Sequence, residues 1–130
     1  MSPLKALFGF KGRMRRRDFW TYVAVFWAAY VALIAAGAAA LHAVSPFTPG
    51  RSAGICILAS LPLVVWIYLA LHIKRLHDIN RPASTVISTL RPILGWIWGV
   101  SECGLRDGTP GPNAYGPSPK GAKSVADVFD

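Results

Sequence analysis

The chain has 130 residues, of which 53% are hydrophobic and only 15% are charged. Because an ordinary soluble domain carries about 25% charged residues, this composition argues against a soluble protein and favours one embedded in a membrane. The formal net charge of +8 is concentrated at the start, where six of the fourteen cations precede the first long apolar run. Basic charge in that position is typical of membrane orientation and anionic lipids, so we expect no nucleic-acid partner.

Residues 1–18 form a basic segment, which the positive-inside rule places in the cytoplasm. Guanidinium groups can pair bidentately with lipid phosphates, and tryptophan suits the level of the headgroups. The residues predicted to contact anionic phospholipid headgroups are Lys11, Arg13, Arg15, Arg16, Arg17 and Trp20. A topology signal without a specific ligand is the simpler interpretation of the same cations.

Two uncharged runs follow, at residues 19–41 and at about 53–73. As a helix the first run is about 35 Å long, which is enough to cross a bilayer with some tilt. The second contains Pro62, which spanning helices tolerate and which should kink it. The turn signals in SPFTPGRS, residues 45–52, separate the two runs.

Alanine recurs at every fourth residue of the first run. This spacing makes a smooth stripe that another helix can approach closely: Ala24, Ala28, Ala32, Ala36 and Ala40.

Residues 83–105 predict a third transmembrane helix, although Arg91 and Pro92 stand near its middle. An arginine at the centre of a span costs about 2.5 to 3.5 kcal/mol on insertion scales. We expect this segment to cross with help from its neighbours, and an interfacial or re-entrant course is the alternative. If it crosses, the chain from Ser101 onward lies in the periplasm. The prediction is an all-α integral membrane helical bundle, with a membrane domain at residues 19–105 and a Gly/Pro-rich turn segment and tail at 106–130.

The stretch HIKRLHDINRP, residues 72–82, is the strongest candidate for chemistry. His72 and His77 are five residues apart, with no cysteine or glutamate nearby, so we predict no metal site. Neighbours on a helix point about 100° apart, so Asp78 is badly placed to orient His77, and we predict no catalytic residue and no cofactor. The favoured interpretation is electrostatic, with Asp78 paired to a cation of the N-terminal segment. The predicted cytoplasmic polar cluster contains Arg13, Arg15, Arg16, Arg75, His77, Asp78 and Arg81.

Three motifs together resemble the domain-of-unknown-function 805 family, small bacterial inner-membrane proteins of the YhaH type. They are Gly12-Arg13, Arg15-Arg16 and Phe19-Trp20; then Arg75-Leu76-His77-Asp78 and Arg81; then Gly108-Thr109, Gly111, Asn113, Tyr115-Gly116-Pro117 and Pro119. The resemblance implies an integral inner-membrane protein with several spans, and it implies no activity. Pro82-Ala83-Ser84-Thr85 stands where the family looks to have a small residue and tryptophans, and Arg91 interrupts a normally apolar span.

Functionally we expect a non-enzymatic membrane protein that acts through helix packing, anionic lipid headgroups or a protein partner, a second copy included. The alternative is a subunit of a small oligomeric transporter or channel, in which Arg91 faces the interior of a bundle and binds an anion. An enzyme that uses His77 and Asp78 is the least favoured class.

Overall fold

The computed structural model describes residues 3–121, and the regular secondary structure of this part of the chain is helical, with one isolated β-bridge between Asn113 and Gly116. Its elements are α1 (Pro3–Phe8), α2 (Arg16–Val44), α3 (Pro49–Asp78), the 3₁₀ helix η1 (Ala83–Leu90), α4 (Leu94–Gly99) and the π-helix η2 (Val100–Leu105). The all-α prediction is confirmed. The part of the predicted tail beyond residue 121 lies outside the described residues.

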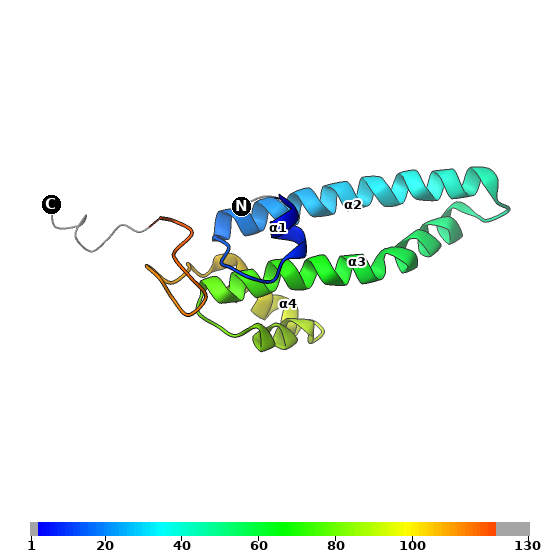
Figure 1. Ribbon diagram of the computed structural model, residues 1–130. Helices are drawn as coiled ribbons and strands as arrows, with labels where there is room; N and C mark the ends of the chain where they lie inside the picture. Colours follow the sequence, from blue (N-terminus) through cyan, green and yellow to red (C-terminus); the bar gives the residue numbers. More distant parts are fainter. Residues whose placement is uncertain (1–2, 122–130) are drawn as a thin grey trace.

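α2 and α3 form a long antiparallel hairpin, with α1 and the remaining helices gathered near one end of it (Figure 1). Both helices are long and apolar enough to cross a membrane, as the two uncharged runs predicted. α2 presents Tyr30 to α3, where its hydroxyl lies 3.0 Å from the hydroxyl of Ser60. Gly37 permits close approach further along, since a Cβ atom there would lie 3.4 Å from the sulfur of Cys56. Pro62 does not end α3, because this helix continues through it to Asp78.

The alanine stripe of α2 faces away from α3. All five of its residues, from Ala24 to Ala40, are exposed. The α2–α3 contact is made instead by a neighbouring face that carries half-buried Val23, Phe26 and Tyr30. The small-residue face predicted for helix approach is therefore not used within the described part of this chain.

The prediction of one continuous helix over residues 83–105 is wrong. The segment is divided into η1, α4 and η2, with its first break at Arg91 and Pro92. Proline disfavours helical geometry at the residue before it, and Arg91 has an extended backbone with ψ 130°. Ile93 adds a positive φ of 60°, after which α4 runs back toward the start of η1. The described residues thus include two helices of spanning length, and not three.

Both ends of the 83–105 segment lie beside the C-terminal end of α3 (Figure 1). The backbone amide of Thr109, just after η2, donates to the carbonyl of Asp78 over 2.8 Å. We call this part of the molecule the basal end, made of residues 3–18, 72–82 and 103–119. Because residues 103–119 share it with residues 3–18, they do not occupy the opposite end of the hairpin, as a third crossing requires.

The buried core lies at the basal end and next to it. It joins α1, α2, α3, η1 and η2 through side chains at most 7% exposed, among them Ala6, Phe19, Leu76, Val86 and Cys103. The other half of the hairpin consists of two helices with mostly exposed apolar side chains. Such a surface fits a hydrocarbon environment, in which exposed leucine and valine cost nothing.

Candidate functional site

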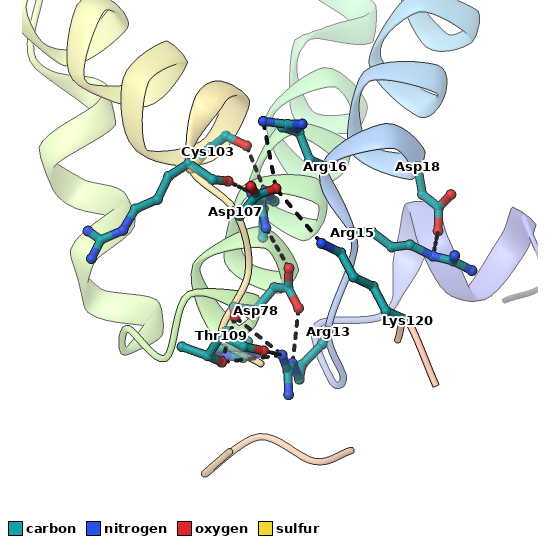
Figure 2. A network of polar contacts seen from close by, with 12 residues as sticks. Arg13, Arg15, Arg16, Asp18, Asp78, Cys103, Asp107, Thr109 and Lys120 are labelled. Atoms are coloured by element: carbon teal, nitrogen blue, oxygen red, sulfur yellow. Dashed lines mark hydrogen bonds and ion pairs between the residues drawn. The ribbon is translucent and has the colours of Figure 1, made fainter. Parts of the chain in front are cut away.

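A buried ion cluster lies at the centre of the basal end. One carboxylate oxygen of Asp78 lies 3.0 Å from Nε of Arg13, and the other lies 2.5 Å from Nη1 of Arg75 (Figure 2). The three side chains are at most 3% exposed. Removing charges from water is costly, and such a group is stable only when its remaining donors and acceptors are also paired. The ion pair expected between Asp78 and the N-terminal segment is confirmed, with Arg13 as the partner.

Arg13 also binds the turn segment after η2. It donates to the carbonyl of Thr109 over 2.6 Å, to that of Gly111 over 2.7 Å and to that of Gly116 over 3.2 Å. These carbonyls belong to a segment without regular secondary structure, so they have no helical partner. The carbonyl of Gly116 also accepts from the backbone amide of Asn113. A guanidinium group carries five N–H donors in a planar fork. Arg13 therefore fixes the fold of a segment about a hundred residues away in sequence.

Two further buried cations close the ends of short helices. Arg75 donates to the carbonyl of Cys103 over 2.7 Å and also to that of Arg106, at the end of η2. Lys74 donates to the carbonyl of Lys5 over 2.6 Å and to that of Ala6, in α1. The last carbonyls of a helix have no partner inside it and attract cations. Arg13, Arg75 and Lys74 carry three positive charges, and Asp78 carries one negative charge. The carbonyl dipoles that accept from these cations compensate the remaining positive charge.

His77 faces the turn segment. Its ring is stacked on that of Tyr115, with centroids 3.9 Å apart and planes 7° apart. Its Nδ1 lies 3.3 Å from the carbonyl of Gly12, and its own carbonyl accepts from the side-chain amide of Asn113 over 2.8 Å. His77 and Asp78 are neighbours in sequence, but their side chains have different partners: that of His77 contacts Tyr115 and Gly12, and that of Asp78 contacts Arg13 and Arg75.

The other predicted members of the polar cluster lie around its edge. Arg15 is 3.3 Å from Asp18, and Arg16 is 3.6 Å from Asp107 and donates to the carbonyl of Leu105. Arg81 is 3.4 Å from Glu102. All three arginine side chains are at least 39% exposed, so water weakens these ion pairs.

Two members of the site were missed in the sequence. Lys74 lies in the stretch 72–82 but is not among the residues predicted for the polar cluster. Gly108 allows the close approach of the turn segment, because a Cβ atom there would lie 2.0 Å from a carboxylate oxygen of Asp78. The signal for Gly108 was its position in the turn-rich stretch, but only the location of Asp78 explains why the residue is glycine.

The residues predicted to bind lipid headgroups divide into two groups. Lys11, Arg16 and Arg17 are exposed, and the partly exposed indole of Trp20 donates to the carbonyl of Gly104 over 3.0 Å. Arg15 is half-buried. Arg13 is 4% exposed and its donors are used inside the protein, so the prediction that it contacts headgroups is wrong.

Arg91 is exposed at the turn between η1 and α4. Within residues 3–121, the structure contains no group of three side chains suited to hold a metal ion.

Comparison with known proteins places the chain among bacterial membrane proteins. Inner membrane protein YhaH of Escherichia coli K12 is 33% identical over 131 residues, covering 92% of this chain and 94% of YhaH. Inner membrane protein YhaI is 32% identical over 121 residues, covering 92% and 93%, and the uncharacterized protein YiiR is 28% identical over 151 residues, covering 98% and 97%. No solved structure is similar. Together with the two long apolar helices, these relatives support an inner-membrane protein.

The family match covers most of the chain and includes the whole ion cluster. Residues 7–117 match the family described as protein of unknown function (DUF805). This range begins before Arg13 and ends just after the Asn113-to-Gly116 turn. The chain therefore belongs to the DUF805 family of proteins of unknown function.

Proposed function

We propose that this is a non-enzymatic inner-membrane protein whose basal end lies at the cytoplasmic face and binds anionic phospholipid headgroups. The observation that carries the proposal is that the charged side chains at that end fall into a buried group and an exposed group. The carboxylate of Asp78 is buried between two guanidinium groups, while Lys11 and Arg17 are exposed just before the apolar part of α2. Exposed cations close to the first turn of a spanning helix attract anionic lipids.

The proposed orientation rests on the uneven distribution of cations. The opposite end of the hairpin carries only Arg51, in the first turn of α3, whereas the basal end carries most of the remaining cations. Short loops rich in lysine and arginine stay in the cytoplasm. On this proposal the chain crosses the membrane twice, and residues 83–105 enter and leave from the cytoplasmic side.

A structural role for the ion cluster supports the proposed absence of catalysis. Both carboxylate oxygens of Asp78 accept from guanidinium groups, and its carbonyl accepts from Thr109. A general base has to reach the proton that it removes, and an oxygen held in this way does not. A complementation assay with His77→Ala tests the enzyme alternative, since a full loss of function in a protein of unchanged stability would contradict the proposal.

The lipid-binding proposal is tested with a matched pair of charge substitutions. Arg17 and Arg51 are both exposed and both lie in the first turn of a spanning helix, but at opposite ends of the hairpin. In nanodiscs that contain phosphatidylglycerol and phosphatidylcholine, Arg17→Gln should weaken the enrichment of phosphatidylglycerol around the protein about fivefold. Arg51→Gln should leave it nearly unchanged. Equal effects, or no effect of Arg17→Gln at low salt, would refute headgroup binding at the basal end.

The transporter or channel alternative rests on Arg91. Its exposed position means that an anion path would need further chains around it, because the described residues of this chain do not enclose it.

A further inference from the structure

A cavity of about 410 Å³ lies between α2, α3 and α4, next to the basal end. Its walls carry an unusual share of aromatic rings: Phe19, Trp20, Phe26, Trp27, Tyr68 and Trp96. It extends along α2 from Phe19 to Trp27, which is about 12 Å at 1.5 Å per residue. Trp27 and Trp96 at its rim are 50% and 76% exposed, so the cavity opens sideways, toward the surroundings of the hairpin. Its volume is in the range of small-molecule sites.

His72 lines this cavity together with Tyr68 and three tryptophans, and it is the lining side chain that carries an imidazole. Its Nδ1 lies 2.9 Å from the carbonyl of Tyr68 in the preceding turn of α3. A carbonyl oxygen only accepts, so Nδ1 carries the proton, and Nε2 of the neutral ring is an acceptor. No hydrogen bond from the residues between 3 and 121 reaches Nε2. The ring is held in place by Tyr68, stacked at 3.9 Å, and by Phe19, edge-on at 5.3 Å.

His72 lines an apolar cavity, and within a membrane little water is present to satisfy the Nε2 acceptor of such a side chain. A ligand that satisfies Nε2 has to donate a hydrogen bond. Aromatic walls add a preference for a flat ring, which can stack on them or meet their edges. The lateral opening leaves room for an apolar tail to extend into the lipid.

We propose that this cavity binds a hydroxylated aromatic lipid of the isoprenoid hydroquinone class. The ring lies among the tryptophan and phenylalanine side chains, one hydroxyl donates to Nε2 of His72, and the isoprenoid tail leaves between Trp27 and Trp96. The oxidised quinone has carbonyl acceptors in place of hydroxyl donors, so it cannot make this bond and binds more weakly. This site shares Trp20 with the headgroup surface but uses none of its cations, and it goes beyond the function proposed above.

The test compares ligands that differ in one group. Purified protein in nanodiscs is titrated without oxygen, using tryptophan fluorescence, with a benzohydroquinone bearing one isoprenoid unit, its dimethyl ether and a straight-chain fatty alcohol. The hydroquinone should bind about threefold to tenfold more tightly than the ether, the range of one hydrogen bond. In His72→Phe this preference should disappear. A preference that survives in His72→Phe, or equal binding of the ether by the unmodified protein, would overturn the role of His72.

A second pair of variants tests the cavity itself and leaves the His72–Tyr68 bond in place. Val100 lines the cavity, whereas Val65 does not, and both are 49% exposed. Val100→Trp should fill the cavity and weaken hydroquinone binding at least about tenfold, and Val65→Trp should have no effect. Unchanged binding in Val100→Trp, or a fatty alcohol that binds as tightly as the hydroquinone, would refute the proposal. Arg17→Gln should not alter hydroquinone binding, which separates this result from that of the headgroup experiment.

Discussion

The guanidinium of Arg13 and the carboxylate of Asp78 meet at 3.0 Å, across 65 residues of sequence, with both side chains almost completely buried. This contact joins the segment before α2 to the end of α3, and the other donors of Arg13 hold the turn segment against the same point. The basal end is therefore organised around one ion pair.

Replacing Asp78 with alanine should reduce the stability of the protein strongly. It leaves Arg13 and Arg75 buried without their carboxylate, and breaking a buried ion pair in this way costs about 3 to 5 kcal/mol. Asp18→Ala is the control, because its ion pair with Arg15 is about 38% exposed and should contribute little. The measurement is the melting temperature of the detergent-solubilised protein. Similar melting temperatures for the two variants would contradict a structural role for Asp78.

Arg13→Lys should also destabilise the protein, although it keeps the charge. A lysine ammonium cannot reproduce the planar fork that binds Asp78 and the carbonyls of Thr109 and Gly111 together. Limited proteolysis should then cut the turn segment around residues 106–119 faster than in the unmodified protein. Arg16→Lys, at a more exposed arginine with a single carbonyl partner, should not change the rate.

A methyl group at residue 108 should prevent the turn segment from closing. A Cβ atom on Gly108 would collide with a carboxylate oxygen of Asp78 at 2.0 Å, so Gly108→Ala should lower the melting temperature. Gly54→Ala provides the control, because no atom lies within 4 Å of a Cβ atom at that position in α3. There the exchange should be neutral or stabilise by about 0.5 to 1 kcal/mol, since alanine favours a helix. A stable, well-folded Gly108→Ala protein would show that the segment is held by other means.

Single-cysteine labelling should find residue 118 on the same side of the membrane as residue 11. Lys11→Cys and Ser118→Cys should both react from the cytoplasmic side, and Arg51→Cys should react from the periplasm. Cys56 is replaced by alanine, whereas Cys103 can stay, because it is fully buried and burial raises the pKa of its thiol to about 11. Periplasmic labelling of Ser118→Cys would instead show that residues 83–105 cross the membrane.

Arg91→Leu should improve membrane insertion without lowering stability. Arg91 is exposed at the turn of the 83–105 segment, and removing a charge from within a bilayer gains up to about 2.5 to 3.5 kcal/mol on insertion scales. Insertion is measured with a reporter fused after residue 105, and function by complementation. Better insertion with normal complementation would count against a channel that uses Arg91, whereas a loss of function would support it.

The hairpin could be predicted because its signal is local. Two uncharged runs of sufficient length, separated by prolines and a glycine, specify two helices whatever else the chain does. The course of residues 83–105 could not be predicted in the same way, because a run interrupted by Arg91 and Pro92 is compatible with crossing, lying in the interface or turning back. Contacts made by Arg75 and Thr109 on either side of it settle the arrangement in the structure.

The ion cluster was predictable only in part. Topology brings the residues around Arg13 to the same end as Asp78, which was sufficient to expect their pairing. The partners of Lys74 are carbonyls of α1, a six-residue helix with no clear signal in the sequence. The aromatic cavity is likewise lined by side chains from α2, α3, α4 and η2, and no short stretch of sequence reveals it.

The contact between Arg13 and Gly111 also has a consequence for the order of synthesis. Arg13 is made before its partner Gly111, which follows 98 residues later. At about 5 to 20 residues per second, that interval is roughly 5 to 20 s. During this interval the two long helices can insert into the membrane, but the guanidinium of Arg13 does not yet have all its carbonyl partners. Until Thr109 and Gly111 have been made, Arg13 and Asp78 lack part of their set of partners, so the basal end closes only after both long helices have been made.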